Sequence, residues 1–101
     1  MYLVREVMYC KPGKVRPMVD KFLAMAKMME QAGQGKMLVL TDFVAERFWT
    51  IVCEYEIENP SQIMSMEGVD EETMKKMDEL MKDYHDYVVK GKREVYRIEG
   101  R

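Results

Sequence analysis

The sequence is poor in the residues that build common catalytic and metal sites. It has one histidine, His85, and two cysteines, Cys10 and Cys53, in 101 residues. A single histidine excludes a metal centre made of several histidines, and the two cysteines lack the C-x-x-C spacing of zinc and redox motifs. We therefore expect no metal and no resident cofactor. Both cysteines are interpreted as reduced and structural.

The sequence also lacks a strong net charge and a long apolar run. A formal net charge of -2 provides no basic surface to attract nucleic acid. The apolar run at residues 1–10 contains Arg5 and Glu6, so we expect it to be neither a secretory signal nor a membrane span. We expect one cytoplasmic domain over residues 1–101, without a nucleic acid or a membrane as partner.

What the sequence does contain is a clear β-strand pattern at residues 47–57. Trp49, Ile51 and Cys53 fall on one side of such a strand, while Thr50, Val52 and Glu54 fall on the other. Because the second side mixes apolar and acidic residues, it does not suit a position between two hydrophobic layers. This pattern predicts a sheet that is covered on one side only.

The rest of the chain predicts three more strands and two long helices. The apolar residues from Lys14 to Met29 recur every three or four positions, and Asp70 has the position of a helix N-cap, with Gly91 ending that second helix. The resulting order, βαββαβ, is typical of the ferredoxin-like α+β fold, with a four-stranded antiparallel sheet and both helices on one face. The predicted strands are 2–9, 36–43, 47–57 and 92–99, with a hairpin of about four residues between the second and the third.

The uncovered face of this sheet is the place where we expect function. Pairing of the first and third strands brings Arg5 near Cys53, but a slip of one residue exchanges Arg5 and Glu6, so either can point there. An apolar surface with scattered charges is typical of a self-complementary contact between two subunits. The other residues expected on this face are Thr50, Val52, Glu54, Arg93, Val95 and Arg97.

The chain resembles the dimeric α+β barrel superfamily, most closely its NIPSNAP-like branch. The resemblance rests on the element order, the length, and the turn YCKPGKV at residues 9–15 that leads into a helix with Phe22. It implies a homodimer with a pocket in each subunit, and its members include cofactor-free monooxygenases, haem-degrading enzymes and lactone isomerases. Aligned on Pro12 and Gly13, this chain has Glu6 and Met8 where the NIPSNAP-like strand tends to have arginine and tyrosine, so no catalytic role is transferred.

Three residues are candidates for chemistry. His85 is interpreted either as a half-buried residue at the edge of the second helix or as a general base or axial haem ligand. Glu54, with Arg5 or Arg97, forms either a structural ion pair across strands or a polar anchor in a cavity. The methionines at helical spacing are interpreted as core, while Met64 and Met66 form a weak candidate site for soft copper.

These observations support three hypotheses about function. The first is a homodimeric protein that binds a small apolar or aromatic molecule. Any reaction would be a cofactor-independent oxygenation or isomerisation, with His85 or Glu54 as base and Arg5 as anion stabiliser. The second is a non-enzymatic dimerisation or interaction module, and the third is a haem-binding protein.

Overall fold

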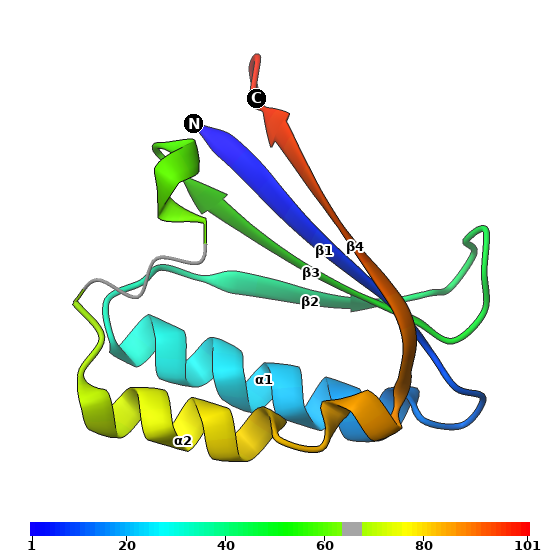
Figure 1. Ribbon diagram of the computed structural model, residues 1–101. Helices are drawn as coiled ribbons and strands as arrows, with labels where there is room; N and C mark the ends of the chain where they lie inside the picture. Colours follow the sequence, from blue (N-terminus) through cyan, green and yellow to red (C-terminus); the bar gives the residue numbers. More distant parts are fainter. Residues whose placement is uncertain (64–67) are drawn as a thin grey trace.

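The computed structural model describes residues 1–63 and 68–101, and its elements follow the predicted order. The four strands form one antiparallel sheet in the order β2-β3-β1-β4, and both helices lie on the same side of it (Figure 1). This confirms the ferredoxin-like α+β fold. None of the helices in the described ranges is long and apolar enough to span a membrane. The elements are β1 (Tyr2–Cys10), α1 (Val15–Gln31), β2 (Met37–Thr41), β3 (Thr50–Ile57), the 3-10 turn η1 (Pro60–Gln62), α2 (Glu71–Met81), the 3-10 turn η2 (Tyr84–Asp86) and β4 (Val88–Arg97).

Helix α1 contributes Val15, Met18, Val19 and Phe22 to the core because its apolar residues recur on one face. Met18 is fully buried, and Phe22 keeps only 5% of its surface exposed. They pack with Ile51 and Cys53 of β3 in one cluster that also includes Cys10. Both cysteines are buried and free. Met18 and Met77 are buried, and Met25 and Met81 pack against the cluster, as their spacing predicts, whereas Met74 is 38% exposed and is not part of the core.

The register of β1 settles which of Arg5 and Glu6 faces away from the helices. Arg5 lies opposite Glu54 and Glu6 lies opposite Cys53, one residue away from the predicted register. Because directly opposite residues share a face, Arg5 lies with Glu54 on the uncovered side. Glu6 lies with Cys53 on the side of the helices.

The predicted phase of β4 is wrong. Glu6 lies opposite Arg93 and Tyr2 lies opposite Arg97, so both arginines are on the helix side, together with Val95. Residues 92–97 carry charges on both faces, so no apolar alternation specifies which face turns inward. Figure 1 also shows why the helix side tolerates charge here: the sheet diverges from the helices toward the ends of β3 and β4.

The connection between β2 and β3 is longer than the predicted four-residue hairpin. Strand β3 begins at Thr50 and not at Arg47, because Trp49 adopts a positive φ of 61° that interrupts the extended chain. The Thr50 N–H donates to Asp42 Oδ1 at 2.9 Å, and the Thr50 hydroxyl donates to the Arg47 carbonyl at 2.9 Å. These bonds close the base of a loop over residues 42–49.

Helix α2 begins at the predicted N-cap but ends earlier than predicted. The Asp70 carboxylate accepts a hydrogen bond from the Thr73 N–H, as expected of an N-cap. The helix then ends at Met81, and Gly91 lies inside β4, opposite Met8.

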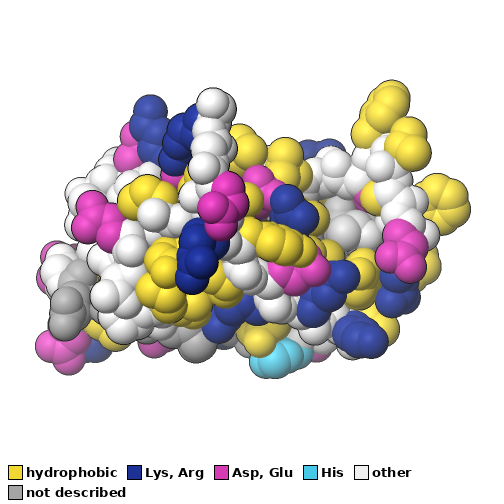
Figure 2. Space-filling view, turned by 90° about the horizontal axis from the view of Figure 1, so that it is seen from above, with side chains coloured by type: hydrophobic (Ala, Val, Ile, Leu, Met, Phe, Trp, Pro, Cys, Tyr) yellow, Lys and Arg dark blue, Asp and Glu magenta, His cyan; other side chains and the backbone are white. Residues whose placement is uncertain are grey.

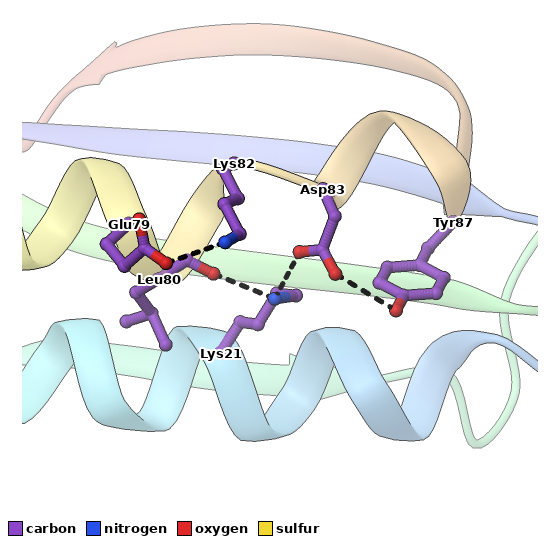
Figure 3. A network of polar contacts seen from close by, with 6 residues as sticks. All are labelled: Lys21, Glu79, Leu80, Lys82, Asp83 and Tyr87. Atoms are coloured by element: carbon purple, nitrogen blue, oxygen red, sulfur yellow. Dashed lines mark hydrogen bonds and ion pairs between the residues drawn. The ribbon is translucent and has the colours of Figure 1, made fainter.

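Lys21 of α1 explains the early end of α2. Its ammonium donates to the Leu80 carbonyl at 2.7 Å, which a continuing helix would need for its own bonding, and lies 2.5 Å from Asp83 Oδ1 (Figure 3). The Tyr87 hydroxyl donates to the other oxygen of the Asp83 carboxylate. The last turn of α2 is therefore fixed by another helix, so the local pattern alone does not reveal where α2 stops.

Replacing Lys21 tests this contact. Lys21→Met keeps an apolar side chain of similar length but removes the ammonium, so we expect a loss of about 1–2 kcal/mol in unfolding free energy by urea denaturation. Lys76→Met is the matched control, because the Lys76 ammonium is largely exposed and lies 3.6 Å from Glu72 on the helix surface. Equal losses in both variants would contradict a specific role for Lys21.

Candidate functional site

We call the sheet surface opposite the helices the open face. It is the side seen in Figure 2, where apolar side chains alternate with basic and acidic ones. The register assigns its members from all four strands. They are Leu3, Arg5, Val7, Tyr9, Leu38, Leu40, Thr50, Val52, Glu54, Glu56, Lys90, Lys92, Glu94 and Tyr96.

An ion pair occupies the middle of the open face. Arg5 Nε donates to Glu54 Oε2 at 2.7 Å, and the Glu54 side chain is only 17% exposed. The hydrogen bond to Glu54 raises the pKa of Arg5 against the opposing effect of burial. The Arg5 guanidinium also lies 5.4 Å from the centre of the Tyr96 ring. The structure thus brings together two of the three candidate residues, Arg5 and Glu54.

Large apolar side chains surround this pair and are open to solvent in the single chain. Leu38 is 57% exposed, Leu40 is 37% exposed and Tyr96 is 45% exposed. Val52 lies between β1 and β2, opposite both Val7 and Leu40. Exposed large apolar side chains gathered on one face of a sheet mark an interaction surface.

Thr50 is buried at the end of the open face, where its polar groups hold the loop over residues 42–49. Its exposed fraction is 6%, and both its N–H and its hydroxyl are bonded to residues 42–49. Its position opposite Tyr9 assigns it to the open face as predicted, but its polar groups are already used.

Arg97 and Glu6 belong to the other side of the sheet. The Arg97 guanidinium lies 6.0 Å from the ring centre of Tyr2, and it is not a partner of Glu54. Glu6 accepts a hydrogen bond from Arg93 Nε. The sequence did not predict this second ion pair, because the phase of β4 cannot be read from residues that are charged on both faces.

Burial on the helix side changes the acidity of two groups near Glu6. Burial, with a smaller contribution from the Glu6 charge, raises the pKa of the Cys53 thiol to about 12. The same two causes, in the same order, raise the pKa of Tyr55. Neither group is prepared for nucleophilic catalysis, which needs a lowered pKa.

The raised pKa of Cys53 predicts an inert thiol. At pH 8 only about one molecule in ten thousand carries the thiolate, so iodoacetamide should leave Cys53 unmodified in the native protein. In urea the same residue should react at the rate of an ordinary cysteine. Peptide mass spectrometry after timed labelling measures both rates, and similar rates in the two conditions would contradict the burial of this side chain.

His85 lies away from the ion pair. It is exposed on η2, on the helix side of the sheet, and its ring centre lies 4.0 Å from that of Tyr84. The prediction that it belongs to a long helix is wrong, because α2 has already ended. The structure does not bring His85 together with Arg5 and Glu54.

The described residues form no cluster of three or more His, Cys, Asp and Glu side chains that could hold a metal ion. Met64 and Met66 lie outside the described residues. Among the hollows formed by the described residues, one of about 450 Å³ lies between the 42–49 loop and the start of α1, and one of about 480 Å³ lies between α1 and α2. Neither is lined by Arg5, Glu54 or His85.

Comparison with known proteins identifies the fold. No protein-family model and no curated protein matches the sequence. An uncharacterised NIPSNAP-like domain protein from Burkholderia xenovorans superposes with a TM-score of 0.67 at 8% identity, over 96% of this chain and 84% of that one. A structural-genomics protein from Agrobacterium tumefaciens superposes with a TM-score of 0.64 at 9% identity, over 96% and 92%. The predicted resemblance to NIPSNAP-like proteins is therefore confirmed at the level of the fold.

Proposed function

We propose that this chain forms a homodimer through its open face and binds a small, largely apolar molecule beside the Arg5–Glu54 pair. The observation that carries the proposal is a partly buried ion pair within an exposed apolar face. Exposed apolar surface favours association, and a polar group within it gives a bound molecule a fixed orientation.

The charges of the open face favour a second copy as the partner. A surface that meets its own copy doubles any net charge it carries, so self-pairing requires a balanced face. The open face is balanced, because three basic residues match three acidic ones. The basic residues are Arg5, Lys90 and Lys92, and the acidic ones are Glu54, Glu56 and Glu94.

The chemistry of the ligand follows from Arg5. The ion pair engages Nε of its guanidinium, which has further N–H donors on its terminal nitrogens. The surroundings are the Tyr96 ring and aliphatic side chains. The ligand we propose is therefore an apolar or aromatic molecule with one carbonyl or carboxylate group.

If the protein is an enzyme, the reaction we propose is a cofactor-independent oxygenation or isomerisation. In this proposal Glu54 is the base and Arg5 stabilises the developing anion. Glu54 is preferred over His85 for this role because His85 lies on the helix side. His85→Ala should therefore leave turnover unchanged.

A non-enzymatic dimerisation module is the second candidate. It is favoured by the 2.7 Å hydrogen bond between Arg5 and Glu54. Because the two groups satisfy each other, they need no ligand, and such a pair suffices to set the register of two subunits.

Native mass spectrometry of the purified protein tests both candidates. We expect a dimer with extra mass in the wild type. We expect a dimer without extra mass in the double variant Arg5→Met with Glu54→Gln, which removes both charges of the pair and keeps the face balanced. Arg97→Met is the matched control, since Arg97 also lies over a tyrosine ring but on the other side of the sheet. It should keep both the dimer and the extra mass. A bare wild-type dimer would favour the dimerisation module, and a monomer would contradict both candidates.

A further inference from the structure

The loop over residues 42–49, which we call the arm, exposes apolar side chains almost completely. Phe43 is 99% exposed, Val44 is 90% exposed and Phe48 is 82% exposed. In Figure 1 the arm extends beyond the end of the sheet, and Figure 2 shows hydrophobic side chains projecting at that same end. Such exposure is unusual for large apolar residues of a folded chain and marks a contact surface.

The base of the arm is fixed. Asp42 and Thr50 are joined by two hydrogen bonds, one from each N–H, at 3.2 and 2.9 Å. The Thr50 hydroxyl adds a third bond, to the Arg47 carbonyl. Because these bonds fix both ends of the arm, its apolar side chains are held at a defined position beside the sheet.

The arm bends toward the open face. The Arg47 guanidinium lies 4.2 Å from the ring centre of Tyr9, which is a member of that face. The pKa of Lys92, another member, is raised first by its hydrogen bond with Tyr9 and then, more weakly, by Glu94 and by Glu46 of the arm. The arm therefore stands at one end of the open face. A partner protein that covers the open face also contacts the arm.

We propose that the arm clasps a second copy of this chain, with Phe43 and Val44 seated on the partner subunit. The inference rests on the proposed dimer and adds the part of the chain that holds it. Two-fold symmetry supplies two arms, one from each subunit, so the contact is made twice. The charge balance of the open face favours a second copy of the chain as the partner that covers this face.

Photo-crosslinking tests where the arm lies. Phe43→p-benzoylphenylalanine, illuminated in the purified dimer, should yield a covalent product of twice the chain mass. Leu23→p-benzoylphenylalanine is the matched control, because Leu23 is 53% exposed on α1, on the other side of the sheet. It should yield no such product.

A second variant measures the strength of the contact. The combined change Phe43→Ser and Val44→Ser should weaken the dimer at least about tenfold in sedimentation velocity. The monomer should keep its unfolding temperature, since these side chains make little contact within one chain.

The outcomes separate the inference from the proposed function. A wild-type dimer whose affinity is unchanged by the serine variant, without a crosslink from position 43, would overturn the clasp and leave the dimer standing. A wild-type protein that stays monomeric would overturn both.

Discussion

Leu40→Glu is expected to convert the dimer into monomers. Leu40 lies on the open face opposite Val52, with no basic residue directly across from it. In a face that meets its own copy, the substitution places two unpaired carboxylates in the contact and upsets its charge balance. Leaving a buried charge unpaired costs about 3–5 kcal/mol, so the dissociation constant should rise by at least about 100-fold.

Sedimentation velocity over a concentration series measures this effect. Leu23→Glu is the matched control, since Leu23 is the more exposed of the two leucines, at 53% against 37%, and lies on α1. The control should remain dimeric. If both variants dimerise like the wild type, the open face is not the contact. If only Leu23→Glu dissociates, the contact lies on the helices.

Met18→Ala is expected to cause the largest loss of stability in a single chain. Met18 is fully buried between α1 and the sheet, in the cluster with Ile51 and Cys53. Its truncation leaves a cavity that the close-packed neighbours fill only in part. We expect the unfolding free energy to fall by about 2–5 kcal/mol.

Urea denaturation at a concentration below that of dimerisation measures the loss without a contribution from association. Met74→Ala is the control, because Met74 lies on α2 with 38% of its surface exposed. It should lose less than about 1 kcal/mol. A small loss at Met18 would contradict its place at the centre of the core.

The fold could be predicted from the sequence because its strongest patterns are local. The apolar spacing in α1, the N-cap at Asp70 and the alternation in β3 each specify an element without help from the rest of the chain. The end of α2 could not be predicted, because Lys21 of another helix binds the Leu80 carbonyl. The helical spacing of Tyr84 and Tyr87 continues past that point although the helix does not.

The candidate site could be predicted only where the alternation was clear. Glu54 lies on the face expected for it, because apolar residues on the opposite side of β3 specify its phase. Arg97 was placed wrongly, because β4 carries charges on both faces. The exposure of the arm was also not predicted, because the sequence FVAERFW at residues 43–49 has the apolar and aromatic residues of a strand. Only the positive φ of Trp49 and the hydrogen bonds of Thr50 distinguish this segment from a strand.

Hydroxyl-radical footprinting at low and high protein concentration tests most directly whether a second copy covers the open face. We predict that Leu38 and Tyr96 lose reactivity as the concentration rises, while Leu23 keeps its reactivity. Protection that does not change with concentration at Leu38 and Tyr96, or protection that appears at Leu23 instead, would contradict the assignment of the open face as the contact between two subunits.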